Sequence, residues 1–371
     1  MKPYVPDQLP ITELDYQRLF ALVADASAEL ARYDGLLLGI PNPAVMLSPL
    51  TTREAVLSSK IEGTQATVDD VLEYDAGLAK EGENYKDIQE IANYRSALYQ
   101  ARDYLQDYPI RLGFILQMHK ILMSSVRGEN KEPGEFRRTQ NWIGTAGCSI
   151  EQASFVPPDP VRLPDYLQAL IGYMDSDDSN VLLQSAVVHA QFELLHPFND
   201  GNGRIGRILI PLFLYQKRLL AEPMFYLSEY LESHRDEYYQ RLSSISSAGD
   251  WNGWIAFFLQ AVAYQAKDNS RRVKEIMALY ETMKVQVHEI TRSQYSVYLL
   301  DAIFNKPIFR VSDATKQFSR TYAIHEKTTA DLFRQLKEAG ILSVLQQGSG
   351  RRSATLCFPA LLNLAEGRKI I

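Results

Sequence analysis

The feature that most constrains how this 371-residue chain can fold is one short run, residues 196–207, with the sequence HPFNDGNGRIGR. Apolar residues at helical spacing precede the run from Ala186 to Leu195 and follow it from Ile205 to Phe213. This pattern predicts a helix, a tight glycine-rich loop and a second helix. Gly201 and Gly203 permit backbone conformations that a Cβ forbids, so N–H groups can turn inward where the second helix begins and form an anion cradle.

Charged and titratable residues around this loop have the chemistry that binding a nucleoside triphosphate requires. Asp200 is a hard oxygen ligand suited to a Mg²⁺ ion that bridges phosphates. Arg204 and Arg207 are three residues apart on one helix face, where each can offer a planar fork of donors to phosphate oxygens. An ordinary imidazole titrates near ~6.5, so a neutral His196 can take a proton from an incoming hydroxyl. Phe198 is expected to point inward and fix the loop.

The twelve residues match the signature HPFx[DE]GNGRxxR, and the chain therefore resembles proteins with a Fic domain. The resemblance implies a protein adenylyltransferase, which moves AMP from ATP to a Ser, Thr or Tyr hydroxyl of a target protein and of itself. It also implies that His196 is the general base, that Asp200 binds Mg²⁺ and that Arg207 binds the γ-phosphate. The implied nucleotide-binding residues are Glu62, Gly201, Asn202, Gly203, Arg204, Ile205, Gly206, Arg207 and Tyr239. Each of these residues taken alone has an ordinary structural interpretation. Only their occurrence together favours a nucleotide-binding site.

A second motif, residues 58–63 with the sequence SSKIEG, fits the pattern [ST]xxxE[GN] of autoinhibited Fic proteins. Thr51 or Thr52 can cap a helix that Gly63 ends, and Ser58 and Glu62 then share a face. By resemblance, Ser58, Glu62 and Gly63 form an inhibitory motif in which Glu62 pairs with Arg207 and removes the donors for the γ-phosphate. The alternative is an ordinary exposed helix end.

Residues 133–158 form the third matching region, in which β-branched and aromatic residues around a small-residue tip predict a hairpin at 139–158. In Fic proteins this position holds a flap that docks the target by strand pairing, which implies a docking role for Trp142, Ile143 and Gly144. A surface hairpin without function is the alternative.

Further on, the pattern of residues 228–242 predicts one helix with paired tyrosines. Tyr239 is the candidate to contact adenine, and a buried core tyrosine is the alternative.

The chain is predicted to be mostly α-helical, with a helical N-terminal region (1–105), a Fic core (106–290) that contains the flap, and a C-terminal domain (291–371). Residues 306–371 carry a net charge of +6, whereas the whole chain carries −6. Their pattern of helices, turn and strands resembles a winged helix-turn-helix domain. Its candidate contact residues are Thr328, Thr329, Arg334, Gln335, Arg351 and Arg352. DNA contact, dimer contact and substrate capture remain open alternatives, because a charge of this size also fits weak nonspecific binding.

Composition favours a soluble enzyme of the cytoplasm. Hydrophobic residues make up 46% of the chain, and two distant cysteines, Cys148 and Cys357, indicate no disulfide framework. Met1 to Pro10 have no apolar signal core, and the histidines have no metal-ligand spacing. Three other functions remain open: removal of AMP from a modified protein, transfer of another nucleotidyl group such as UMP, and a DNA-binding regulator whose Fic core senses nucleotide.

Overall fold

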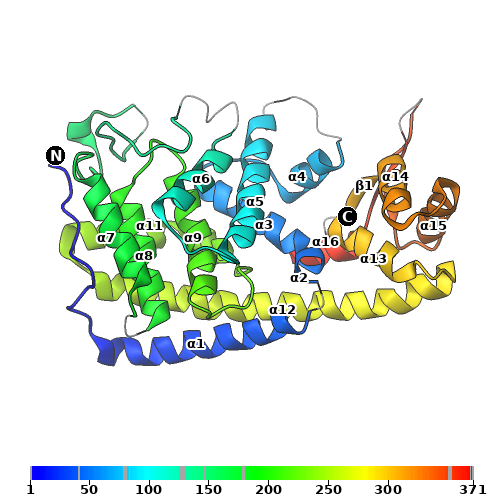
Figure 1. Ribbon diagram of the computed structural model, residues 1–371, viewed down its shortest axis with the longest axis horizontal. Coiled ribbons are helices and arrows are strands. Elements are labelled where there is room, and N and C mark those ends of the chain that lie inside the picture. Colours follow the sequence, from blue (N-terminus) through cyan, green and yellow to red (C-terminus); the bar gives the residue numbers. More distant parts are fainter. Residues whose placement is uncertain are drawn as a thin grey trace. The chain divides into compact units, whose positions relative to one another are not determined.

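The computed structural model describes residues 2–40, 42–77, 82, 84–124, 131–145, 147–177, 180–349, 353–367 and 369 (Figure 1). The helices are α1 (Tyr16–Leu38), α2 (Pro43–Met46), α3 (Ser48–Ile61), α4 (Val68–Asp75), α5 (Tyr85–Leu105), α6 (Leu112–Leu122), α7 (Leu163–Asp175), α8 (Val181–Leu195), α9 (Asn202–Gln216), α10 (Ser228–Ser233), α11 (Arg235–Ala248), α12 (Trp251–Thr291), α13 (Ser296–Asn305), α14 (Val311–Tyr322), α15 (Glu326–Glu338) and α16 (Pro359–Glu366), with one 3-10 turn, η1 (Ile150–Gln152). The strands are β1 (Ile308–Arg310), β2 (Ser343–Gln346) and β3 (Thr355–Cys357). The mostly helical fold class is confirmed.

The chain folds as two compact units. Unit 1 comprises Met1–Gly35, Leu57–Thr64 and Gln89–Asp268, and unit 2 comprises Leu36–Val56, Gln65–Ile88 and Asn269–Ile371. All three motifs of the sequence lie in unit 1. The basic C-terminal region lies in unit 2.

Unit 1 is built around α8, which packs against α7, α9 and α11 (Figure 1). Its sequence is apolar on nearly every face, so almost all of its residues are buried and it forms the centre of the helical core. Asn180 caps its start, where the side-chain oxygen accepts the N–H groups of Leu182 and Leu183 at 2.9 and 3.3 Å. Its end is fixed by His196, which adopts the left-handed conformation with φ +46°, and by Pro197. The predicted helix, loop and second helix are thus confirmed.

Three local predictions differ from the structure. Thr51 and Thr52 do not cap α3, because they lie inside it and their hydroxyls donate to the carbonyls of Leu47 and Ser48. The single helix predicted at 228–242 is divided into α10 and α11, which meet at His234. In the predicted hairpin, the described residues contain only one antiparallel bridge, between Ile143 and Phe155, so this segment is a loop for most of its length.

Unit 2 contains a three-stranded antiparallel sheet in the order β1-β3-β2. Helices α13, α14 and α15 follow the predicted pattern, while β1 is too short to have been detected from periodicity. Phe309, Phe318 and Phe333 are buried and pack their rings together at this core. Arg351 and Arg352, the predicted wing tip, lie outside the described residues. None of the helices in the described ranges is both long and apolar enough to cross a membrane.

Candidate active site at the start of α9

The loop between α8 and α9 is closed by its own residues. The Asn202 side chain accepts the Phe198 N–H and donates to the Phe198 carbonyl, each at 2.8 Å. Gly201 has φ +80°, a conformation that favours glycine, and its position starts α9. By the general rule that first-turn N–H groups lack partners inside a helix, those of Asn202, Gly203 and Arg204 are available to an anion. The Ile205 N–H instead donates to the Gly201 carbonyl at 3.1 Å, and the Ile205 side chain is buried.

His196, the candidate base, is held in a defined tautomer. Its Nδ1 lies 3.3 Å from the carbonyl oxygen of Glu193, and because a carbonyl only accepts, Nδ1 carries the hydrogen. Nε2 is therefore the nitrogen that can accept a proton. Burial lowers the pKa of His196 to about 4, so the ring is neutral at pH 7.

Two residues that sequence reasoning did not select support this loop. Arg137 is buried, and it donates from Nε to the His196 carbonyl at 2.9 Å and from Nη2 to the Pro158 carbonyl at 2.6 Å. His119 stacks on Phe198 and contacts the Asp200 carbonyl at 3.0 Å through Nε2, while its Nδ1 accepts the Gly134 N–H at 2.9 Å. Burial lowers its pKa to about 4. Phe198 is fully buried, as predicted.

Arg204 and Asp200 are linked to each other beneath the loop. Arg204 is buried and forms an ion pair with Glu90, with Nη1 and Oε2 2.7 Å apart. Its Nη2 lies 3.3 Å from Asp200 Oδ1, which also accepts the Gly201 N–H at 2.6 Å. The Asp200 side chain remains 37% exposed. The guanidinium of Arg204 is thus already paired, whereas Asp200 can still reach a ligand.

Arg207 joins the motif at residues 58–63 to the run at 196–207. Its Nη2 donates to Glu62 Oε1 at 2.6 Å and to the Ser58 carbonyl at 2.8 Å, and its Nε donates to Ser58 Oγ at 2.8 Å. Burial alone would raise the pKa of Glu62, but the adjacent guanidinium of Arg207 holds it below its ordinary value, so this carboxyl is ionised. Gly63 follows with φ +98°. The predicted pair between Glu62 and Arg207 is therefore present as a direct contact.

Two glycines of α9 make room for carboxyl groups. Gly203 is helical rather than left-handed, and its role is close approach: a Cβ there would overlap Glu62 Oε1. A Cβ at Gly206 would overlap Glu193 Oε1. Glu193 was not selected from the sequence, although its place one turn before His196 on a buried helix was a usable signal.

The predicted flap and adenine contacts lie on the surface of unit 1. Trp142 and Ile143 are 42% and 40% exposed, and Ile143 exchanges backbone hydrogen bonds with Phe155. Beside them, Gly144 approaches Cys148 so closely that a Cβ would overlap its sulfur. Tyr239 is 42% exposed and Arg235 lies over its ring, whereas Tyr238 is the buried core tyrosine. Trp142, Ile143 and Tyr239 are therefore accessible to a ligand or a partner.

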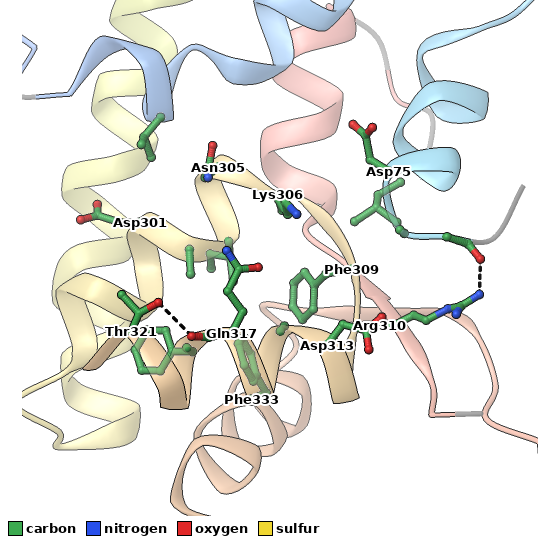
Figure 2. A pocket seen from close by; sticks show the side chains of 18 of the residues that line it. Asp75, Asp301, Asn305, Lys306, Phe309, Arg310, Asp313, Gln317, Thr321 and Phe333 are labelled. Atoms are coloured by element: carbon green, nitrogen blue, oxygen red, sulfur yellow. Dashed lines mark hydrogen bonds between the residues drawn. The ribbon is translucent and has the colours of Figure 1, made fainter. Parts of the chain in front are cut away.

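A separate cavity of about 370 Å³ lies in unit 2 (Figure 2). Its walls include the ring of Phe309 and the polar side chains of Asp75, Lys306 and Gln317. None of residues 58–63 or 196–207 is among the described residues that line it. The cavity is therefore distinct from the site at α9.

Comparisons with known proteins agree with this geometry. The family model described as Fic/DOC family N-terminal matches residues 20–103, and the model described as Fic/DOC family matches residues 109–214. A protein of Aquifex aeolicus, named a probable protein adenylyltransferase, is 26% identical over 193 residues, which are 51% of this chain and 56% of that protein. The protein adenylyltransferase Fic of Drosophila grimshawi is 30% identical over 184 residues, which are 48% of this chain and 34% of that protein. This chain thus spans about a third to just over half of the length of these relatives.

The crystal structure of a Fic family protein from Desulfovibrio desulfuricans has the same fold, with a TM-score of 0.57 and 21% identity over 96% of this chain and 98% of that one. The two family models together cover α3, the flap region and the loop between α8 and α9, where His196, Asp200 and Arg207 converge. From these matches we conclude that the chain belongs to the Fic/DOC family.

Proposed function

We propose that this protein is a protein adenylyltransferase, which transfers AMP from ATP to a Ser, Thr or Tyr hydroxyl of a target protein. The observation that carries the proposal is the position of His196 at the end of α8: a neutral ring with Nε2 left to accept a proton, on the loop that leads into the first-turn N–H groups of α9, which suit phosphates. The names of the curated relatives support the same reaction.

In the proposed reaction, the hydroxyl oxygen of the target attacks the α-phosphorus of ATP in line with the bond to the β-phosphate. Nε2 of His196 takes the hydroxyl proton, a P–O bond joins AMP to the target, and the broken bond releases pyrophosphate. The N–H groups of Asn202 to Arg204 hold the α- and β-phosphates, and Arg207 holds the γ-phosphate once it is free of Glu62. Arg204, paired with Glu90, positions Asp200 and the loop in this scheme.

The donor set fits a Mg²⁺ ion at Asp200. A partly exposed carboxylate that keeps one oxygen bonded to the loop can offer its other oxygen to a hard cation, and a single carboxylate together with substrate phosphates is a common way to hold Mg²⁺. When bound, the ion would neutralise phosphate charge.

Autoinhibition by Glu62 forms part of the proposal. Glu62 and Ser58 occupy Nη2 and Nε of Arg207, so the fork of donors is not available to the γ-phosphate. If the pair is worth about 2–3 kcal/mol, as charge-assisted hydrogen bonds are, productive ATP binding falls about 30- to 150-fold.

One observation favours a second candidate, the removal of AMP from a modified protein. The charge of Glu62 acts on His196 as well as on Arg207, so the carboxylate faces the reacting region and could orient a water for hydrolysis. Glu62 would then inhibit one direction and support the other.

For unit 2 we propose a winged helix that contacts protein, either the target or a second copy of the chain, rather than DNA. Arg334 on α15 is already paired with Asp331 and Glu338 at 3.1 Å, and Thr329 is fully buried against Ser319. Thr329 is therefore not placed to contact DNA, and two neighbouring carboxylates compensate the charge of the exposed Arg334. Both cysteines are free thiols, which suits the reducing cytoplasm.

The test is intact-mass spectrometry of the purified protein incubated with ATP and Mg²⁺, alone and with a lysate. We expect AMP to be added to the protein or to a lysate protein, more strongly by Glu62→Gly and not at all by His196→Ala, although the latter should still bind ATP. UTP in a parallel reaction distinguishes transfer of UMP. A His196→Ala variant that modifies its target at the wild-type rate would remove the base assignment.

The same experiment separates the two directions. Glu62→Gly should raise transfer by the 30- to 150-fold estimated above. If Glu62 also orients a hydrolytic water, the variant should in addition fail to remove AMP from a pre-modified target. Absence of any gain in transfer, with ATP binding confirmed, would contradict the inhibitory role of residues 58–63.

A further inference from the structure

A second carboxyl group lies near Arg207, and neither the proposed reaction nor the proposed inhibition uses it. Glu193 is on α8, one turn before His196. Its Oε1 is fully buried and has no hydrogen-bond partner among the residues that the structure describes. Buried polar atoms are normally satisfied, so this oxygen is free to gain a partner when a ligand binds.

The carboxyl of Glu193 lies against Gly206, in the second turn of α9. Because a Cβ at Gly206 would overlap Glu193 Oε1 and a Cβ at Gly203 would overlap Glu62 Oε1, each carboxyl lies against a glycine. Residues three apart share a helix face, so Glu62 and Glu193 border the same face of α9, next to Arg207. Of these two carboxyls, Glu62 accepts a hydrogen bond from Arg207 at 2.6 Å, whereas Glu193 Oε1 has no partner among the described residues.

The two carboxyls differ in protonation. Burial raises the pKa of Glu193 to about 8, with Arg207 acting to lower it and Glu62 to raise it further. At pH 7 Glu193 is therefore mainly a neutral carboxylic acid with one O–H to donate, whereas Glu62 is an anion. Paired groups whose surroundings separate their pKa values commonly have different roles in a site.

The other titratable groups around Glu193 are Glu62, Arg207, His189, His196, Tyr238 and Tyr239. Burial lowers the pKa of His189 to about 3, lowers that of His196 to about 4, and raises those of both tyrosines above their ordinary values. Despite burial, Glu62 holds the pKa of Arg207 above its ordinary value. Among these groups, Glu193 is therefore the one expected to lose a proton near pH 8.

We propose that Glu193 is a nucleotide-binding residue whose carboxylic acid O–H donates to an anionic oxygen of the phosphate chain that Arg207 also binds. The inference rests on the proposed function, because it requires a triphosphate at the first turn of α9. An ionised Glu193 would repel the phosphates. The protonated acid instead donates its O–H to a phosphate oxygen, which gives the buried carboxyl group a hydrogen-bond partner. Glu62 thus competes with the phosphates for Arg207, and Glu193 binds them together with Arg207.

The experiment is a calorimetric titration with a non-hydrolysable ATP analogue and Mg²⁺ from pH 7 to 9.5, in the Glu62→Gly background so that the site is open. Affinity should be constant near pH 7 and fall tenfold per pH unit above a break near or somewhat below pH 8, because Glu62 no longer raises the pKa of Glu193. Glu193→Gln keeps a donor and should lose this break. Glu193→Met, of similar length without a donor, should bind about tenfold or more weakly at pH 7.

The outcomes separate the inference from the function on which it rests. An alkaline break that persists in Glu193→Gln, or a Met variant that binds as tightly as its parent, would overturn the role of Glu193 and leave nucleotide binding intact. A folded parent that binds no ATP analogue at any pH would instead contradict the proposed function.

A second measurement covers the case in which the Met variant does not fold. In ¹³C NMR spectra of glutamate-labelled protein, the carboxyl signal that is absent from Glu193→Gln should titrate near pH 8 and shift to higher pH when the nucleotide is bound. A titration that the nucleotide leaves unchanged would also overturn the inference.

Discussion

Arg207 is the residue on which both proposed states of the site depend. Its side chain is only 2% exposed, and its charge is compensated by Glu62. Leaving a buried charge without its partner costs about 3–5 kcal/mol, so states in which an anion lies beside this guanidinium are favoured. In the proposed function, Glu62 and a γ-phosphate are therefore alternatives for the same donors, and the proposed inhibition is a competition between them.

The first prediction concerns Arg207 itself. In a Glu62→Gly background, Arg207→Ala should weaken ATP binding about tenfold or more and ADP binding much less, because only ATP presents a γ-phosphate to the lost fork. Calorimetric titration with both nucleotides measures the difference. Arg241→Ala, which removes an exposed arginine paired only with Glu237, is the control. An equal loss for ATP and ADP would mean that Arg207 does not read the γ-phosphate.

At the scale of elements, the loop between α8 and α9 is held from beneath by side chains far away in sequence. Arg137 donates to carbonyls of His196 and Pro158, and His119 bridges the Gly134 N–H and the Asp200 carbonyl. The loop also contains a non-glycine left-handed residue, His196, a conformation that costs about 1–2 kcal/mol unless its surroundings impose it. These contacts supply that constraint.

The neighbouring arginines 137 and 138 give a matched test. Arg137→Met should lower the free energy of unfolding by about 2–4 kcal/mol, because it leaves several buried carbonyls without a donor. Arg138→Met should change it by less than about 0.5 kcal/mol, since Arg138 is exposed and paired only with Glu135 three residues away. Urea unfolding of both variants measures this, and similar losses would contradict the supporting role of Arg137.

Periodicity and motif spacing predict α8, the glycine-rich loop and α9, because these depend on local sequence. The resemblance to autoinhibited Fic proteins implies that Glu62 pairs with Arg207, and the structure brings Ser58, Glu62 and Arg207 into contact. Periodicity and motif spacing could not identify Arg137 or Glu90, whose roles arise from contacts across 59 and 114 residues of chain. The hairpin predicted at 139–158 is reduced in the described residues to one antiparallel bridge between Ile143 and Phe155, because the β-branched and aromatic residues there form no extended ladder.

For the whole molecule, acid sensitivity should follow from buried histidines. Burial lowers the pKa values of His119, His189 and His196 to about 4, 3 and 4, so these rings are neutral when folded and become protonated near ~6.5 when unfolded. The unfolded state then binds more protons, and stability is lost as the pH falls from about 6.5 towards 4. Glu193 acts in the opposite direction. Because its pKa is raised in the folded state, the folded protein holds about one proton more than the unfolded chain above pH ~4.5.

We therefore expect a net uptake of about two protons on unfolding, and a loss of about 2–3 kcal/mol of stability per pH unit between pH 6 and 5. Urea unfolding at pH 7, 6 and 5 measures this slope. His189→Gln should make the slope shallower, whatever it does to stability at pH 7. A slope equal in wild type and His189→Gln would contradict the assignment.

The absence of a Cβ at Gly203 limits which mutations could relieve the proposed inhibition by Glu62 during evolution. The glycine lies against Glu62 Oε1, and its N–H belongs to the turn that suits phosphates. A side chain at position 203 that displaced Glu62 would also lie against the N–H groups proposed to bind the phosphates, so we expect such a mutation not to yield an active enzyme. Lineages that lose the restraint are expected to do so by changing residues 58–63, and to retain glycine at position 203.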